Sequence, residues 1–375
     1  MSIDVAARAR AGFITRAKSL IAASAVLTVA VAALSVAAVG SASASARPIT
    51  PTSGVTWHNL SLLYGWQAIN GSGSPAWAIQ NGIVYLSGSI HQVSGKNPEF
   101  AVLPTVAAPA HLQYIPVHTN NNTGGYLDVY PFGGLGAGSS PSGNARAFTS
   151  LAGISFPAAG TALHTLNLQA GWVSLQSGFN TGDPSYSVSG GMVHLSGAMW
   201  RASGSSSVFA VLPIAARPTS TEYIPDYTDG ATTGALEIFS NGQLEATGIM
   251  AQPFTSLAGV SFPAASLSSQ KLGLINGWQA VPASATNGYP AYAVSHGVVD
   301  LSGALFQPGD GSSEFAVLPV AARPRHNLYI EADTMSGSVG TVEIQPDGVM
   351  SAISTPAANA QHFTSLAGIS YPVNS

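Results

Sequence analysis

The chain contains no cysteine, and charged residues make up only 7% of its sequence. Without cysteine, disulfide bonds and thiolate metal sites are excluded, so each folded part must depend on its hydrophobic core. The 12 Lys and Arg residues are outnumbered by 16 Asp and Glu residues, which gives a formal net charge of −4 at pH 7. A chain without a basic excess is poorly suited to polyanions, and we therefore expect no binding to nucleic acid.

Sequence motifs of catalytic chemistry are also missing. The nine histidines form no H-x-x-x-H or H-E-x-x-H pattern, and the chain has no G-x-S-x-G nucleophile elbow. Carboxylate pairs occur at Asp226 with Asp229 and at Glu331 with Asp333, in polar sequence that we expect to form turns. A glycosidase needs two carboxyl groups about 5 to 9.5 Å apart across a cleft, which the sequence alone leaves open. We expect a non-enzymatic protein without a cofactor.

A long apolar run occurs only near the amino terminus, from Leu20 to Val39. It follows four cationic residues, which are Arg8, Arg10, Arg16 and Lys18. Small-residue A-x-A sites at 42–44 and 44–46 come directly after the run. This order is typical of a secretory signal peptide over residues 1–46, so we expect a secreted, extracellular protein that begins near Arg47 and has no membrane span. Because about twenty apolar residues can also cross a bilayer, an uncleaved anchor is the alternative.

The rest of the sequence is one repeat written three times. A Gly-Trp pair ends at Trp66, Trp172 and Trp278, a spacing of 106 residues in both steps. FAVLP begins at Phe100, Phe209 and Phe315, and FTSLAG begins at Phe148, Phe254 and Phe363. We infer three modules, at 47–160, 161–266 and 267–375, each large enough to bury its own core. The aromatic residues that recur in every repeat, which are the Gly-Trp tryptophans with Tyr114, Tyr223 and Tyr329 and with Trp77, Tyr186 and Tyr292, are expected in those cores.

Short apolar runs in each repeat are separated by Gly, Pro, Asn and Asp every 8 to 12 residues. This spacing predicts an all-β fold of three tandem antiparallel β-sandwich modules, similar to jelly rolls, with a small barrel as the alternative. A tight hairpin is expected at 81–82, 190–191 and 296–297, and a second one at 240–242 and 346–348. In the first repeat, a Gly/Ser-rich stretch from Pro131 to Gly143 predicts a longer tip for the second hairpin.

The order of the motifs resembles the C-terminal β-sandwich modules of bacteriophage tail fibre and minor tail proteins. The resemblance rests on Gly-Trp, then Gly-x-Val-x-Leu-x-Gly at 82–88, 191–197 and 297–303, then Leu-Pro with Arg-Pro five residues later, then the second hairpin and Ser-Leu-x-Gly-x-Ser-Phe. It covers each repeat nearly from end to end, although each motif is short. The first repeat departs from it, with Ala108-Pro109 where the others have Arg-Pro. The resemblance implies trimeric heads that contact a receptor or glycan, and it assigns no binding residue.

The connections between repeats are short. About eight residues link each repeat to the next, and they span no more than about 26 Å when extended. Neighbouring modules should therefore touch. The three modules could form an internal pseudo-trimer, in which a pseudo-threefold axis replaces subunit symmetry. A string of separate modules is the alternative, and self-association of the whole chain is also open.

The segment before FAVLP keeps its length but changes its chemistry between repeats. His91-Gln92, Trp200-Arg201 and Phe306-Gln307 occupy equivalent places. Aromatic side chains beside polar groups suit a sugar, and exposed loops on a rigid scaffold commonly carry function. His91, Trp200 with Arg201, and Phe306 are therefore the candidate ligand contacts, with the Trp200 pair the strongest. The alternative is that these side chains pack on a neighbouring module.

An acidic residue recurs in the second hairpin, as Asp128, Glu237 and Glu343. Its place between apolar residues predicts a solvent-facing position on a strand. A ring of these carboxylates around a pseudo-threefold axis is the second hypothesis. One carboxylate per module is too few for an oxygen-rich calcium site, so no metal is expected.

Two functions are compatible with these sequence features. The first is that of a secreted protein that recognises a glycan or another cell-surface ligand through loops on its repeated modules. The second is that of a structural or assembly component of the cell exterior without a small ligand. Exposure of His91, Trp200 and Phe306 would favour binding, and their burial between modules would favour the structural role.

Overall fold

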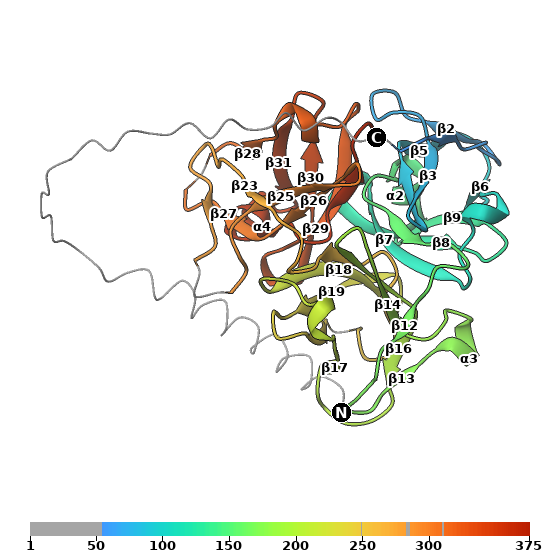
Figure 1. Cartoon of the computed structure of the whole chain (residues 1–375). Helices are drawn as coiled ribbons and strands as arrows, with labels where there is room; N and C mark the ends of the chain where they lie inside the picture. Colours follow the sequence, from blue (N-terminus) through green and yellow to red (C-terminus); the bar gives the residue numbers. More distant parts are fainter. Residues whose placement is uncertain (1–54, 249, 283–285, 310) are drawn as a thin grey trace, which may run out of the picture. The chain divides into compact units, whose positions relative to one another are not determined.

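The computed structural model describes residues 55–248, 250–282, 286–309 and 311–375 (Figure 1). One compact unit spans Ser53–Ser375. The predicted signal peptide and its cleavage site lie outside the described residues. No helix in the described ranges is both long enough and apolar enough to cross a membrane.

Each repeat forms a four-stranded and a seven-stranded antiparallel sheet, and the sheet pair of one repeat is called a module below. In module 1 the four-stranded sheet has the order β1 (His58–Asn59), β3 (Ala76–Gln80), β4 (Ile83–Ser87) and β11 (Ser155–Pro157). Its seven-stranded sheet has the order β2 (Trp66–Ala68), β5 (Ser89–Gln92), β10 (Thr149–Ser150), β7 (Gln113–Thr119), β8 (Thr123–Val129), β9 (Gly134–Ser139) and β6 (Glu99–Val102).

Modules 2 and 3 repeat this strand order. In module 2 the four-stranded sheet has the order β12 (His164–Thr165), β14 (Ser185–Ser189), β15 (Met192–Ser196) and β22 (Ser261–Pro263). Its seven-stranded sheet has the order β13 (Trp172–Ser174), β16 (Ala198–Arg201), β21 (Thr255–Ser256), β18 (Glu222–Thr228), β19 (Thr232–Ile238), β20 (Gln243–Thr247) and β17 (Val208–Val211). In module 3 the four-stranded sheet has the order β23 (Gln270–Lys271), β25 (Ala291–Ser295), β26 (Val298–Ser302) and β33 (Ser370–Pro372). Its seven-stranded sheet has the order β24 (Gln279–Ala280), β27 (Ala304–Phe306), β32 (Thr364–Ser365), β29 (Leu328–Thr334), β30 (Ser338–Ile344), β31 (Val349–Ser354) and β28 (Glu314–Val317).

Helices are short and lie in the connections. They are α2 (Ser142–Ala147), α3 (Gln176–Phe179) and α4 (Ala357–His362), with the 3-10 turns η2 (Thr105–Ala107), η3 (Asn120–Asn122), η4 (Ile214–Ala216), η6 (Val320–Ala322) and η7 (Met335–Gly337). At four to six residues, the α-helices are too short to show a helical period in the sequence.

The two sheets of each module pack face to face around one hydrophobic core. In module 1, Val84 and Phe156 of the four-stranded sheet pack with Ile115 and Leu127 of the seven-stranded sheet. Modules 2 and 3 have equivalent cores. The Gly-Trp tryptophans are buried in these cores, as expected. The predicted all-β fold of three tandem antiparallel β-sandwich modules is confirmed.

The first hairpin of each module has a tight two-residue turn. Both turn residues have positive φ angles in every copy, at 51° and 81° for Asn81 and Gly82, and at 50° and 80° for His296 and Gly297. Such a turn matches the right-handed twist of the strands that it joins. The hairpin predicted from the Asn-Gly, Gly-Gly and His-Gly pairs is therefore present in each module.

The prediction of a longer second hairpin in module 1 is wrong. Strand β8 ends at Val129 and β9 begins at Gly134, so four residues form the tip, as in the other two modules. The Tyr130 N–H donates to Gly134 O at 2.9 Å, and Phe239 makes the same bond to Gln243 O in module 2. The Gly/Ser-rich stretch continues as the strand β9 and the helix α2. The glycines of this stretch lie in a paired strand and do not lengthen the hairpin loop.

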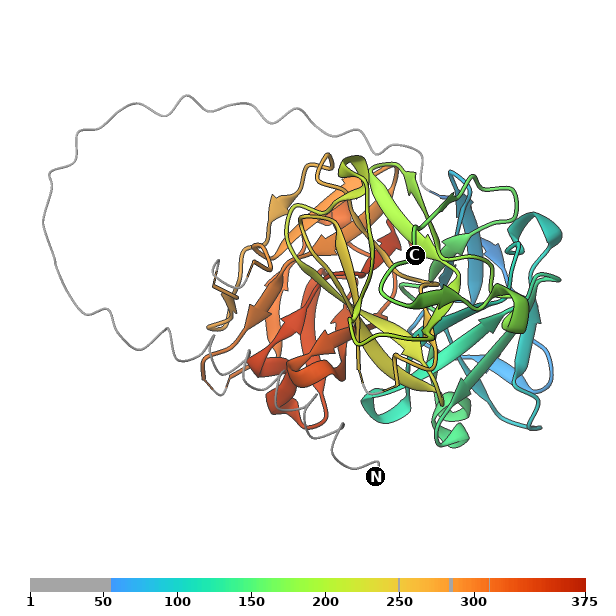
Figure 2. The same cartoon turned by 90° about the horizontal axis from the view of Figure 1, so that it is seen from below.

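The three modules contact one another in a cyclic order. Strands β7, β18 and β29 pack against each other, and Figures 1 and 2 show the three modules side by side. Equivalent backbone hydrogen bonds join the modules, from Leu112 N–H to Asn180 O, from Thr221 N–H to Thr286 O, and from Asn327 N–H to Gly71 O. Module 1 thus donates to module 2, module 2 to module 3, and module 3 back to module 1.

The FTSLAG motif forms the joint between modules. Its alanine belongs to the core of the neighbouring module, so that Ala258 lies in the core of module 1, Ala367 in that of module 2 and Ala152 in that of module 3. The following glycine has a positive φ and no room for a side chain. A Cβ on Gly259 would lie 2.5 Å from Cγ2 of Ile115. The small residues of this motif are therefore explained by contact with the next module.

The prediction that Tyr114, Tyr223 and Tyr329 are core residues is wrong. Each ring is half-buried on the outer face of its seven-stranded sheet and contacts the next module. The Tyr114 ring lies 5.3 Å from that of Tyr227 and 5.5 Å from that of Phe254. Tyr223 meets Phe363, and Tyr329 meets Phe148, in the same cyclic order. Alternation along the strand predicts two faces but cannot tell which neighbour covers each of them.

Candidate functional site

The predicted ligand contacts lie on equivalent strands near the edge of each seven-stranded sheet. His91 on β5 pairs with Gln67, Trp200 on β16 with Val173, and Phe306 on β27 with Gln279. The Trp200 side chain is 39% exposed, whereas His91 and Phe306 are half-buried. None of the three is buried, and Trp200 presents the most accessible ring of this set.

Arg201 was expected to contact a ligand together with Trp200, but its side chain has another role in the structure. Its guanidinium lies 5.7 Å from the centroid of the buried Trp172 ring, and Nη1 donates to Ser206 O at 2.9 Å. Gln92 and Gln307, its equivalents, donate in the same way to Asn97 O and Ser312 O. The residue after the aromatic position therefore anchors the loop that follows it in every module. Arg201 thus orders the loop, and Trp200 presents the exposed ring at this place.

Each member of the acidic trio lies across from a tyrosine on one neighbouring strand, and Glu237 also lies across from Glu245 on β20. Asp128 pairs with Tyr114, Glu237 with Tyr223, and Glu343 with Tyr329. The expected solvent-facing position is wrong for Glu237, which is buried, while Asp128 and Glu343 are half-buried. Burial raises the pKa of Asp128 to about 6. Asp128 and Glu343 therefore keep part of their surface in solvent, whereas Glu237 does not.

Three of the four carboxylates expected in turns lie instead in strands, whereas Asp229 lies in an exposed turn as expected. Asp226 is on β18, and Glu331 and Asp333 are on β29, all of them buried. Thr233 of module 2 donates its Oγ1–H to Oε1 of Glu331 at 3.1 Å, while the buried Oε2 of Glu331 has no partner. Burial raises the pKa of Glu331 to about 8 and that of Asp226 well above its usual value. The contact between modules 2 and 3 therefore holds carboxyl groups that favour the neutral form.

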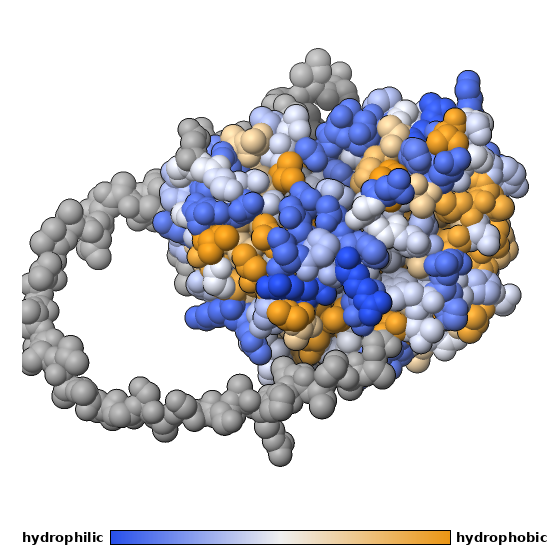
Figure 3. All heavy atoms as spheres, turned by 90° about the horizontal axis from the view of Figure 1, so that it is seen from above, coloured by the Kyte–Doolittle hydropathy of each residue, from blue (hydrophilic) through white to orange (hydrophobic). Residues whose placement is uncertain are grey.

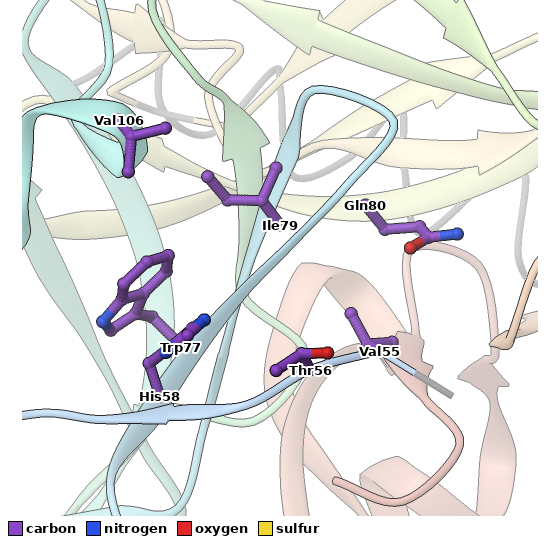
Figure 4. A pocket seen from close by; sticks show the side chains of 7 residues that line it. All are labelled: Val55, Thr56, His58, Trp77, Ile79, Gln80 and Val106. Atoms are coloured by element: carbon purple, nitrogen blue, oxygen red, sulfur yellow. The ribbon is translucent and has the colours of Figure 1, made fainter. Parts of the chain in front are cut away.

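An open pocket of about 470 Å³ lies at the edge of the four-stranded sheet of module 1 (Figure 4). It is lined by Val55, Thr56, His58, Trp77, Ile79, Gln80 and Val106. Trp77 on β3 and its cross-strand partner His58 on β1 stack with ring centroids 4.5 Å apart. The Trp77 ring is half-buried and packs partly against the core, so its position is fixed by the sandwich.

Modules 2 and 3 carry related pairs at the equivalent places. His164 and Tyr186 pair across strands with ring centroids 5.2 Å apart. In module 3, Tyr292 pairs with Gln270 and donates its hydroxyl to Gln270 Oε1 at 2.6 Å. The expectation of a buried core position for these rings holds only in part, since all three are half-buried. One sequence signal could have indicated these cross-strand pairs. A polar residue stands two positions before the repeated leucine in each module, as His58, His164 and Gln270.

The described ranges contain no group of three or more His, Cys, Asp or Glu side chains that could hold a metal ion. Neither a family model, nor a curated protein, nor a solved structure matches the chain in the comparisons that we made. The likeness to tail fibre modules therefore rests on the sequence motifs alone.

Proposed function

We propose that the chain is an exported, non-enzymatic protein that binds a glycan or another cell-surface polymer, with its three modules acting as an internal pseudo-trimer. The exposed ring of Trp200 carries this proposal. A tryptophan ring on a paired strand offers a flat apolar face for sugar stacking and has few rotatable bonds to order on binding. The cyclic contacts of the three modules support the pseudo-trimer.

A structural role at the cell exterior is the second candidate, and a repeated apolar feature favours it. Val102, Val211 and Val317 are exposed at the same place in the three modules, and Ile214 and Val320 add exposed side chains nearby. Figure 3 shows apolar residues in separate patches among hydrophilic ones on one face. Exposed apolar patches often mark contact with another protein surface.

The first test is Trp200→Ala compared with Val173→Ala. The two residues are cross-strand partners with the same exposure, so both variants remove an exposed apolar side chain from one place. Binding to purified cell-wall polysaccharide and thermal melting are measured for each. We expect Trp200→Ala alone to weaken binding, with both melting temperatures close to that of the parent protein.

The outcomes separate the two candidate functions. Unchanged binding by Trp200→Ala would remove this residue from the binding surface. A large drop in melting temperature would assign the ring to packing. If the parent protein retains no polysaccharide and binds no glycan on an array, the binding function fails and the structural role takes its place.

A further inference from the structure

The geometry points to a second sugar-binding site, the Trp77 pocket of module 1, with a neutral saccharide as its ligand. This inference rests on the proposed glycan-binding function, but it concerns different residues from the Trp200 edge. Its volume of about 470 Å³ falls within the range of about 300 to 1,000 Å³ that is typical of ligand pockets.

The lining side chains combine one large ring with hydrogen-bonding groups. Trp77 supplies an apolar surface and an indole N–H donor, Thr56 a hydroxyl, and Gln80 an amide. Figure 4 shows Trp77 and Ile79 on one strand, with Val106 beyond them and Thr56 and Gln80 to the other side. A sugar ring has the matching pattern, with apolar C–H faces and hydroxyl groups around its edge.

The charge of the lining indicates which saccharides fit. The pocket is lined by no Asp, Glu, Lys or Arg side chain, and His58 is its single titratable residue. A uronic or sialic acid carboxylate would find no arginine or lysine there to pair with. A neutral or N-acetylated hexose needs no such partner.

Two structural features hold this site in place before a ligand binds. Trp77 packs against the core of module 1 and stacks with His58, and these contacts limit the rotation of its ring. Gln80 donates its Nε2–H to His296 O of module 3 at 3.2 Å, so its amide is held by the neighbouring module. Fixed side chains lose less entropy when a ligand binds.

A larger side chain at position 106 would block the pocket, and the Val106 side chain that it replaces is too exposed to contribute much to folding. Val106 is 67% exposed on η2, and its equivalent in module 2 is the exposed Ala215 on η4. Val106→Trp places a bulky ring at the pocket, whereas Ala215→Trp adds the same ring outside it. Trp77→Tyr is the second variant, because it introduces the residue that module 2 carries at Tyr186 and so keeps the packing.

Binding of neutral tetrasaccharides of glucose and of N-acetylglucosamine is measured by isothermal titration calorimetry, with the full exported chain. We expect at least one of them to bind, and Val106→Trp to weaken it by about tenfold, equivalent to about 1.4 kcal/mol. Trp77→Tyr should weaken binding less, and Ala215→Trp should leave it within about twofold of the parent. Melting temperatures check that each variant is folded.

Different failures overturn different conclusions. If the tetrasaccharide binds Val106→Trp and Trp77→Tyr as tightly as the parent, the pocket is not the site, while the proposed function stands. If the parent binds cell-wall polysaccharide but neither neutral tetrasaccharide, the assigned ligand class is wrong. Absence of binding to every saccharide and to the cell wall removes both the pocket site and the proposed function.

Discussion

At the scale of single residues, the Gly-Trp tryptophan joins two parts of each module. Its ring lies 5.9 Å from the first phenylalanine of FAVLP, and its indole N–H donates to a backbone carbonyl in the preceding loop. In module 2 these partners are Phe209 and Ser206. One side chain thus fills the core and orders the loop next to Trp200.

We expect Trp172→Ala to lower the free energy of unfolding by roughly 3–5 kcal/mol, as other large-to-small aromatic changes in cores do. The side chain is 3% exposed, so its removal leaves a cavity and also removes one of the two hydrogen bonds that Ser206 O accepts. Chemical denaturation monitored by circular dichroism measures the change. A loss below about 1 kcal/mol would show that the ring contributes little to the core.

The buried carboxyl group of Glu331 should make stability depend on pH. Its pKa rises from 4.5 to about 8 on folding, so its contribution is full below about pH 4.5 and is lost as the pH rises through about 8. We expect Glu331→Gln to reduce the fall in unfolding free energy between pH 5 and 8, by at most about 1.4 kcal/mol per pH unit. Glu314→Gln, at an exposed position, is the matched control.

Buried histidines act in the opposite direction. Burial lowers the pKa of His118 and of His194 to about 4. Their neutral forms therefore contribute stability above about pH 6.5, which is lost as the pH falls through about 4. The free energy of unfolding should be measured against pH both between pH 4 and 6.5 and between pH 5 and 8.

The second range tests Glu331. If Glu331→Gln and the parent protein show the same slope between pH 5 and 8, Glu331 is already ionised in the folded protein.

At the scale of elements, the glycine of FTSLAG limits how closely the modules approach. Gly259 has a φ of +82°, a conformation that costs other residues about 1–2 kcal/mol. Its missing Cβ also makes room for Ile115 of module 1. The same relation holds for Gly368 with Ile224 and for Gly153 with Ile330.

We expect Gly259→Ala to cost at least about 1–2 kcal/mol of unfolding free energy, because it adds backbone strain and a steric clash with Ile115. Gly178→Ala is the control. Gly178 lies in α3, and a Cβ there would have nothing within 4 Å. Urea denaturation of both variants measures the difference. Equal stabilities would mean that the joint between modules can shift to accept a methyl group.

The elements could be predicted from the sequence more fully than their environments. Pairs that contain glycine indicated the hairpins, because the positive φ angles of such turns favour glycine and asparagine. Recurrence in every repeat suggested a core position for Tyr114, but recurrence does not say that the ring packs on a neighbouring module instead. A place between apolar residues suggested that Glu237 faces solvent, although it is buried. Trp200 was predicted as a contact from its chemistry, whereas the role of Arg201 as an anchor depends on a loop carbonyl that no sequence pattern marks.

The pocket was missed for a related reason. Its walls come from β1, β3 and η2, and no local pattern indicates that His58, Trp77 and Val106 meet. Trp77 has the spacing of a core residue, which it partly is. The opening at one side of its ring depends on where the sandwich ends, and that depends on the tertiary fold.

At the scale of the whole molecule, the three contacts between modules differ in chemistry although they are equivalent in place. Tyr227 meets Tyr126 between modules 1 and 2, with ring centroids 5.2 Å apart. The equivalent of Tyr227 in module 1 is His118, which hydrogen-bonds to Thr341 Oγ1 of module 3 at 2.8 Å. In module 3 it is the buried Asp333. Each contact therefore suits one pair of modules.

We expect the three modules to unfold in a single cooperative transition, because each core contains an alanine from another module. Differential scanning calorimetry should give a calorimetric enthalpy equal to the van't Hoff enthalpy. Gly259→Ala, although it lies in module 2, should shift the whole transition to lower temperature. Two or three resolved transitions, with only one of them shifted, would show that the modules unfold independently.

The hydrogen bond from Asn327 to Gly71 closes the cycle between the last module and the first. The chain itself crosses the other two contacts, so this third one forms between groups that are already tethered. Its effective concentration is set by the covalent chain and not by the amount of protein present. Separate single-module chains would dissociate on dilution, whereas this arrangement stays assembled even where only one molecule is present.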